Sequence, residues 1–319
     1  MKAAVGLILV GIAATAVFEI GRYRARIDIQ AAAAGFRGER AFNDLRQLVQ
    51  FGPRPPGSEN LERARAYIER QLSASGVEVL DDSFVTTTLV DNIPMTNVIG
   101  VIHGESPTVV ILAGHYDTAT IDGVRFVGAN DGGSSAAFLL EMARVLSNRK
   151  NKFTYWIVFF DGEEALKQWS ASDSLYGSRH LAKKLLCEGK LGQIKVLILV
   201  DMVADRHLNI LRESNSTAWL SDLVFKTART LGYSKVFSGG TFPVEDDHLP
   251  FGAYCEVMFK PAGARPAPAI DQFGWVAMAY VCGVIQMRKQ RRLTRPQWLG
   301  RQPRSISSLW ERAILQPVT

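Results

Sequence analysis

The sequence has 319 residues, of which 47% are apolar and 21% charged, enough for one large globular domain or two small ones. Its net charge of +6 comes from the end of the chain, because residues 286–319 hold eight Lys/Arg and one Glu, and the other 285 residues sum to −1. A body without excess positive charge is not attracted to phosphate, so we expect no nucleic-acid partner.

The first 26 residues predict a signal peptide or a single membrane anchor. After Lys2, residues 3–18 contain no charged side chain, and Arg22, Arg24 and Arg26 follow. This run is long for the core of a signal peptide and short for a membrane span of about 20 residues. A buried N-terminal helix is the alternative, but no polar face interrupts the run. We expect an exported protein, periplasmic or extracellular, with attachment to the membrane through residues 3–18 as the alternative to cleavage.

Downstream, apolar strands alternate with amphipathic helices. Helices are predicted over 27–52, 60–74 (with Ser58 as its N-terminal cap), 134–146, 174–186 and 216–232, and strands over 97–102, 108–118, 153–160 and 195–204. Near-continuous apolar strands separated by helices indicate a three-layer α/β sandwich whose central sheet is mostly parallel or mixed. We expect a single domain over 27–285, followed by a basic, disordered tail over 286–319.

Acidic residues and one His follow three of these strands and open one helix. They are His115 and Asp117, then Asp161, Glu163 and Glu164, then Asp201, with Asp131 in the loop "GANDGG" before the helix. A single carboxylate at a strand end is usually a cap or a surface residue. Ligands of such sheets bind beyond the carboxyl ends of the strands, so four positions converging there predict a site.

Carboxylates with a His and without a thiolate suit zinc in an open catalytic site. The adjacent glutamates then have separate roles, since neighbours in an irregular turn can point to different sides of one metal. One binds the metal, and the other lies within reach for proton transfer. Asp117, two residues after His115, is placed to orient that ligand from outside the coordination sphere, although a turn-capping Asp is the alternative.

Seven motifs resemble those of the zinc aminopeptidase-like family. In family order they are "GPRPPGS", "NVIG", "GHYDT", "GANDGGSS", "FFDGEEA", "LVDMVAD" and "DDHLPF", and the match covers about residues 40–251. The stretch "DGEEALKQWSASDSLYGSRHLAKKL" is similar to the glutaminyl cyclases (glutaminyl-peptide cyclotransferases) of that family, because its link between the glutamate pair and the "GS" helix start is long and contains a Trp.

The resemblance implies a fold and a chemistry. A single Zn²⁺ would be held by Asp131, Glu164 and a late His, while Glu163 would move the proton from the substrate α-amine to the leaving amide nitrogen. Asp201 and Asp246 would complete an acid network around the leaving group. The α-amine of an N-terminal glutamine attacks its own γ-amide, giving pyroglutamate and ammonia. The partners would be the N-termini of peptides or proteins, and we expect a monomer.

Two further residues are implied in substrate binding. Trp169 matches an aromatic residue of the cyclase pocket and would pack against the glutamine side chain, although a Trp that fills a gap under the loop is the alternative. Glu245 stands where cyclases commonly have Gln, which places a charge beside the substrate carbonyl.

The chain departs from the family pattern after about Phe251. Its five histidines end at His248, so the late zinc ligand is absent, and the final helix of the family is not recognisable. A frameshift or gene-model error explains this change, and genuine divergence is the alternative. His248 could substitute as a ligand, but its position in "DDH" favours a structural role.

The metal prediction therefore has two forms. The cyclase-type position would keep only Asp131 and Glu164, whereas the second position of two-zinc aminopeptidases would use His115, Asp131 and Asp201, all of which are present. Three functions follow: a zinc-dependent glutaminyl-peptide cyclotransferase first, a zinc aminopeptidase that removes N-terminal residues second, and an inactive member of the fold third.

Overall fold

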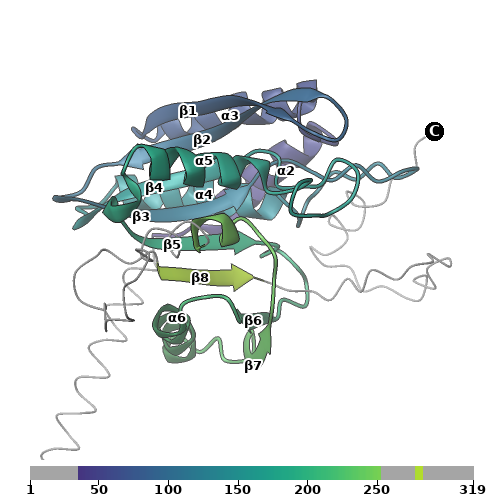
Figure 1. Cartoon of the computed structure of the whole chain (residues 1–319). Helices are drawn as coiled ribbons and strands as arrows, with labels where there is room; N and C mark the ends of the chain where they lie inside the picture. The colour runs from purple at the N-terminus through teal and green to yellow at the C-terminus, as the bar shows by residue number, and fades with distance from the viewer. Residues whose placement is uncertain (1–34, 253–276, 283–319) are drawn as a thin grey trace, which may run out of the picture.

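The computed structural model describes residues 35–252 in full and residues 277–282 as backbone (Figure 1). The predicted signal or anchor over 1–26, most of the late family region and the basic tail over 286–319 lie outside the described residues. Within the described part, no helix has both the length and the apolar character needed to cross a membrane.

The centre is a six-stranded mixed sheet in the order β1-β2-β4-β3-β5-β8. Its strands are β1 (Glu78–Thr87), β2 (Asn92–Ile102), β3 (Ser106–His115), β4 (Phe153–Phe160), β5 (Ile194–Asp201) and β8 (Ala277–Cys282). Strands β4, β3, β5 and β8 run parallel, and β2 is antiparallel to both β1 and β4. The predicted mixed sheet is thus confirmed.

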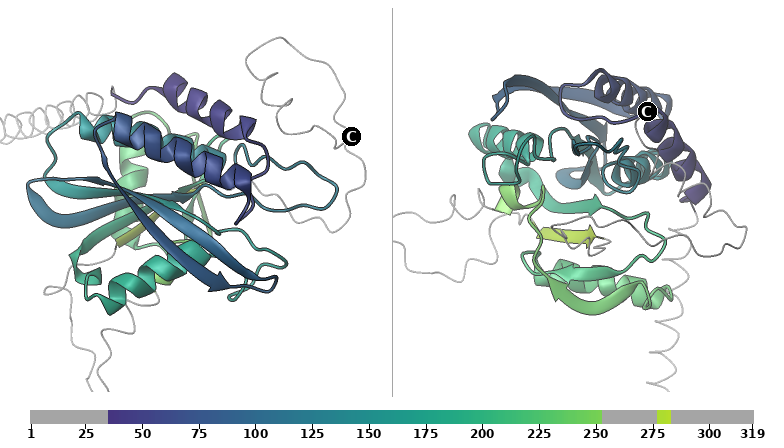
Figure 2. Two further views of the ribbon diagram at one scale, coloured as in Figure 1. Left: turned by 90° about the horizontal axis from the view of Figure 1, so that it is seen from above. Right: turned by 90° about the vertical axis from the view of Figure 1, so that its right-hand side faces the viewer.

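Helices cover both faces of the sheet, as the left view of Figure 2 shows. On one face lies α5 (Tyr176–Cys187), and on the other lie α2 (Gly38–Gln50), α3 (Glu59–Ala74) and α4 (Gly133–Ser147). Helix α6 (Ala218–Thr230) packs near β5, and a two-stranded parallel sheet of β6 (Ile210–Glu213) and β7 (Phe237–Phe242) lies beyond it. The three-layer α/β sandwich is confirmed.

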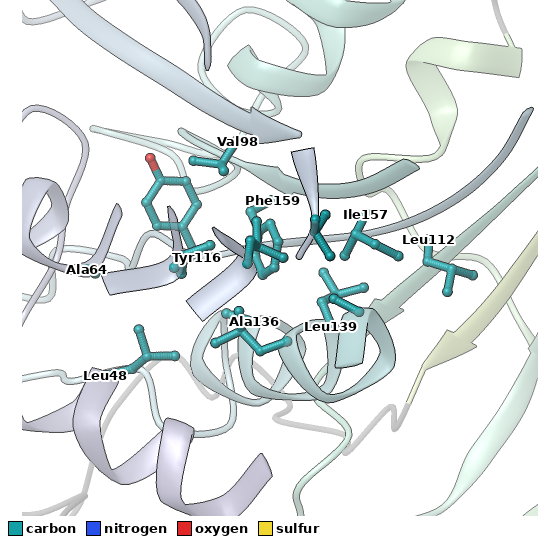
Figure 3. Packing of buried hydrophobic residues seen from close by; sticks show 14 of the residues in the cluster. Leu48, Ala64, Val98, Leu112, Tyr116, Ala136, Leu139, Ile157 and Phe159 are labelled. Atoms are coloured by element: carbon teal, nitrogen blue, oxygen red, sulfur yellow. The ribbon is translucent and has the colours of Figure 1, made fainter. Parts of the chain in front are cut away.

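The central strands are apolar because both of their faces are buried. In β3, Ile111 faces α5 while Leu112 faces α4, so consecutive residues feed two separate cores. Figure 3 shows the α4 side, where Leu139 packs against Phe159 and Ile157 of β4. Such burial stabilises by about 25 cal/mol per Å² of apolar surface, and it anchors the strand ends that carry the polar residues.

The element boundaries differ from the predictions in a few places. The strand predicted to run to residue 204 ends at Asp201, because Met202 adopts a positive φ of 49° that breaks the ladder. The predicted cap is confirmed, since the Ser58 hydroxyl accepts a hydrogen bond from the backbone N–H of Leu61. Strands β1, β6 and β7 were not predicted, and β8 falls within residues 273–285, which resemble no family motif.

Candidate functional site

The parallel strands bring their polar ends to one edge of the sheet. Strand β3 ends at His115, which pairs with Phe160, the last residue of β4 and the neighbour of Asp161. Strand β5 ends at Asp201, two residues beyond the pairing of Leu199 with Ala113. The convergence that the sequence predicted therefore follows from parallel register alone.

His115 is the centre of the cluster, and its side chain is 1% exposed. Its Nε2 atom lies 3.2 Å from Asp131 Oδ1 and 3.2 Å from Asp201 Oδ1. Its Nδ1 atom lies 3.3 Å from Asp117 Oδ1 and 3.8 Å from Glu163 Oε2. One imidazole thus contacts carboxylates on four separate chain positions.

A glycine allows the loop that carries Asp131 to approach this ring. Gly132 has a φ of +74°, and a Cβ atom there would lie 2.3 Å from the backbone oxygen of Asp117 and 3.1 Å from His115 Cε1. No other residue type fits so close an approach or readily adopts that backbone conformation. This explains why a glycine directly follows Asp131 in "GANDGG".

Asp201 is held from two sides. Its Oδ1 accepts hydrogen bonds from the Ser135 hydroxyl at 3.0 Å, in the first turn of α4, and from the backbone N–H of Met202 at 2.7 Å. These bonds, together with Nε2 of His115, fix one oxygen of the carboxylate toward the centre of the cluster.

The glutamate pair lies in the turn after β4 and is anchored through its backbone. Asp117 accepts the N–H of Glu163 at 3.2 Å on Oδ1 and the N–H of Glu164 at 3.1 Å on Oδ2. Asp117 therefore joins the imidazole of His115 to the turn that presents both glutamates. The Glu163 residue is 6% exposed, whereas Glu164 is partly exposed.

The remaining predicted residues lie on two loops next to Glu163. Asp246 is buried, its Oδ1 accepts the N–H of Asp247 at 2.6 Å, and its charge acts on Glu163. Trp169 donates from Nε1 to Glu245 Oε2 at 3.2 Å, which ties the long loop after the glutamate pair to the loop before Asp246. The structure thus joins the two residues that the resemblance assigned to substrate binding.

The carboxylates of this cluster are crowded, and their pKa values show it. Burial raises the pKa of Glu163 well above its usual range, and repulsion from Asp246 and Glu164 adds to this, while His115 opposes it. Burial also raises the pKa of Glu164 strongly, with Asp131 as the main repelling neighbour. For Asp131 the pKa is raised by burial and by Asp201. Each acid resists ionisation because the others are close.

The imidazole responds in the opposite sense. Burial by itself would lower the pKa of His115, but Glu163, Asp117, Asp131 and Asp201 together raise it well above its usual value. At the adjacent strand end, burial and the charge of Asp117 raise the pKa of Asp161 to about 8. The site therefore lacks positive charge relative to its carboxylates, which a bound divalent cation would supply.

The donor set fits such a cation. Among the residues that the structure describes, one group offers three ligand atoms within 4.8 Å of one another, and it consists of His115, Asp131 and Asp201. Imidazole nitrogen with carboxylate oxygens suits zinc. The cyclase-type pair, Asp131 and Glu164, gains no third ligand from these residues.

His248 directly follows Asp247 in the chain, but it does not belong to the three-ligand group of the described residues. It is 1% exposed, and its Nε2 lies 3.4 Å from Glu213 Oε2, at the end of β6. Glu213 also accepts the backbone N–H groups of Asn215 and Val244, so the pair braces the loop that leads to Asp246. This position agrees with the structural role that the sequence favoured.

Two buried groups of the site were not singled out from the sequence. Asp247 is fully buried next to Asp246, and that neighbour adds to the burial that raises its pKa well above the usual range. Arg54 is completely buried under Asp117 and Asp131. The signal for Arg54 was present, because a charged residue between two prolines in "GPRPPGS" has an unusual setting, but its contacts are set by the tertiary structure.

Comparison with known proteins places this geometry in a family. Residues 97–258 match Peptidase family M28. A glutaminyl-peptide cyclotransferase from Drosophila melanogaster is 36% identical over 157 residues, which cover 47% of this chain and 44% of that protein. A glutaminyl-peptide cyclotransferase from Boiga irregularis is 30% identical over 247 residues, with 66% and 67% covered.

Among solved structures, the glutaminyl cyclase of an Acidobacteriales bacterium superposes with a TM-score of 0.68 at 37% identity, and the match covers 77% of this chain and 79% of that one. The chain spans less than half the length of the Drosophila relative. These relatives are cyclases, so they do not favour the aminopeptidase alternative.

Proposed function

The chain belongs to Peptidase family M28 and, within it, to the glutaminyl cyclases, and from this premise we propose that it converts the N-terminal glutamine of peptides to pyroglutamate with release of ammonia. One observation supports the chemistry most directly. Glu163, a buried acid with a raised pKa, lies 3.8 Å from His115 beside a set of metal-ligand atoms.

The proposed role of Glu163 is proton transfer. As a carboxylate it accepts a proton from the substrate α-amine, whose nitrogen then bonds to the γ-carbonyl carbon. As an acid it returns a proton to the amide nitrogen, so that the bond from carbon to nitrogen breaks and ammonia leaves. A raised pKa suits a group that must gain and lose one proton near neutral pH. Asp246 would hold the leaving nitrogen and also helps to keep the pKa of Glu163 high. Asp201 would share this role if zinc took the cyclase-type position, in which Asp201 is not a ligand.

We propose Zn²⁺ as the cofactor, and His115, Asp131 and Asp201 would hold it. In the alternative, cyclase-type position, Asp131 and Glu164 would be its ligands. When bound, zinc polarises the amide carbonyl and stabilises its developing negative charge. Asp117 would orient His115 and the glutamate turn together, because it contacts both.

Substrate recognition is assigned to Trp169 and Glu245. The hydrogen bond between them holds the indole against the loop that leads to Asp246, and its face would pack against the glutamine side chain. Export of the protein, suggested by residues 3–18, would bring it to secreted peptides. We also predict that the protein is a monomer, and light scattering on the purified chain tests this through its molar mass.

The test combines zinc content with mass spectrometry of a Gln-leading peptide after incubation. We expect zinc near one per chain and a product that has lost ammonia but no residue. Loss of the whole N-terminal residue would support the aminopeptidase. If the chain holds zinc but the peptide is unchanged, the chain is an inactive member of the fold and the proposed function is wrong.

A further inference from the structure

Arg54 is among the largest fully buried side chains in the described part of the protein, and it is the charged one among them. It lies in the turn between α2 and α3. Burial lowers its pKa to about 10, an effect that the nearby Asp117 and Asp131 oppose. The guanidinium is therefore still charged at neutral pH, inside the protein and beneath the acid cluster.

Among the described residues, the hydrogen bonds of the guanidinium go to backbone oxygens rather than to a carboxylate. Nε donates to Tyr116 at 3.2 Å, Nη1 donates to Val127 at 2.9 Å, and Nη2 donates to Gly128 at 3.4 Å. Nη1 also lies 3.2 Å from the oxygens of Leu48 and Gly52, at the end of α2. One planar group thus joins the end of α2, close to Arg54 in sequence, to two segments that are 62 or more residues away.

Two of these segments lead to two of the three proposed ligands, His115 and Asp131. Tyr116 lies between His115 and Asp117, and Gly128 lies three residues before Asp131. The backbone of Arg54 adds a second tie, because its N–H donates to the Thr118 hydroxyl at 2.8 Å and its oxygen accepts the N–H of Thr118 at 3.1 Å. The spacing between His115 and Asp131 is therefore set through one side chain that touches neither.

We propose that Arg54 is the positioning residue of the metal site, and that it acts by holding the His115 segment and the Asp131 loop at the separation that binds a divalent cation. This inference rests on the proposed zinc site, but it does not depend on which reaction the site performs. The shape of the guanidinium is the essential property, because its donors diverge in one plane toward carbonyls on different segments. A lysine carries the same charge at a single point and cannot reach all of them.

The experiment uses the full chain, freed of metal, and Co²⁺ as the probe, since its visible absorption reports both affinity and coordination geometry. We expect Arg54→Lys to weaken Co²⁺ binding about 10- to 100-fold and to change the absorption spectrum, as for other residues that support metal ligands. Thr118→Val removes only the acceptor for the Arg54 N–H, so we expect a smaller loss in the same direction. This milder variant decides the question if Arg54→Lys fails to fold.

Arg144→Lys is the matched control. Arg144 is also nearly buried and bonded to several groups, namely Asp44, Glu141 and Gln71, but it lies at the other end of α4. We expect it to lower the melting temperature while Co²⁺ affinity stays within twofold.

Several results would overturn the proposal. One is Co²⁺ affinity equal to that of the wild type in both Arg54→Lys and Thr118→Val. Another is an equal loss of Co²⁺ affinity in Arg144→Lys. A third is no Co²⁺ uptake by the unsubstituted chain, because there would then be no set of ligands for Arg54 to position. Metal binding without any cyclisation would instead refute the proposed function and leave the role of Arg54 intact.

Discussion

Helix α4 has a group of mostly buried charges near each end, and the two groups differ in their balance of positive and negative charge. Toward its C-terminus, Arg144 donates to both oxygens of Asp44 at 2.5 and 3.1 Å and to Glu141 at 3.3 Å. Glu141 also accepts from Arg40 at 2.7 Å. Two acids face two arginines, and hydrogen bonds reach every carboxylate oxygen of the pair.

Toward its N-terminus, one imidazole faces four carboxylates. His115 contacts Asp117, Asp131, Glu163 and Asp201, and the one guanidinium beneath them, that of Arg54, donates to backbone oxygens rather than to acids. Repulsion from neighbouring acids, added to burial, therefore raises the pKa values of Asp131, Glu163 and Glu164.

This difference distinguishes buried charges that stabilise the fold from buried charges that serve a function. A balanced group joins α2 to α4 and needs nothing from outside. An unbalanced group destabilises the folded protein because its like charges repel one another. Such repulsion is retained at functional sites, where a bound cation or a transferred proton relieves it. The balance between positive and negative side chains, rather than the number of charges, distinguishes the two ends of α4.

The largest effect is expected for Glu163→Gln. Glutamine keeps the shape of Glu163 but cannot accept the proton of the α-amine, so we expect turnover to fall by about 10²- to 10⁴-fold while zinc content is unchanged. Ammonia release and metal analysis measure the two quantities. Glu188→Gln, at an exposed position, is the control and should leave both unaltered. Zinc lost together with activity would mean that Glu163 is a ligand.

The balanced group should respond through stability alone. Arg144→Met leaves Asp44 and Glu141 buried without their main cation, and we expect the free energy of unfolding to fall by about 3–5 kcal/mol, as when one partner of a buried pair is removed. Urea unfolding measures this change, and metal content per folded chain should not alter. A loss below about 1 kcal/mol, the range of exposed pairs, would mean that solvent reaches the group.

The last expected effect is a pH dependence of stability from Asp161, which is spread over several pH units. Its pKa is about 8 because of burial and the charge of Asp117, whereas in the unfolded chain it takes the usual value of about 3.9. Between these values the folded protein binds more protons than the unfolded one, so this residue makes stability fall as pH rises from about 4 to 8. We expect Asp161→Asn to remove a slope of up to about 1.4 kcal/mol per pH unit within that window.

Urea unfolding from pH 5 to pH 8 measures the slope. Asp173→Asn is the control, because backbone hydrogen bonds help to lower the pKa of Asp173, and it is ionised throughout this window in both states. An unchanged slope in Asp161→Asn would show that Asp161 is ionised in the folded protein at neutral pH.

Much of the fold could be predicted because its strongest signals are local. The run "FTYWIVFF" predicts a strand of eight residues, and β4 has those bounds. Strands β1, β6 and β7 escaped prediction because they are mostly polar or partly exposed, so apolar periodicity is weak in them. The end of β5 was misplaced because a positive φ at Met202 cannot be read from its apolar neighbours.

The candidate site divides in the same way. His115, Asp131 and Asp201 were singled out together because each follows a strand or opens a helix, and parallel strands end at one edge. The link from Asp117 to both glutamate N–H groups, and the three segments joined by Arg54, could not be predicted. Every residue has a backbone carbonyl, so the sequence does not show which carbonyls a side chain such as that of Arg54 binds.

The sequence by itself determined the α/β sandwich, the resemblance to a cyclase family and the identity of the acids, because apolar periodicity and strand-end chemistry are written residue by residue. Only the tertiary structure decided which acids share one imidazole, how close His115, Asp131 and Asp201 lie to one another, and which segments Arg54 joins. Those outcomes depend on distances between segments far apart in the chain, and such distances are set by how the helices and the sheet pack.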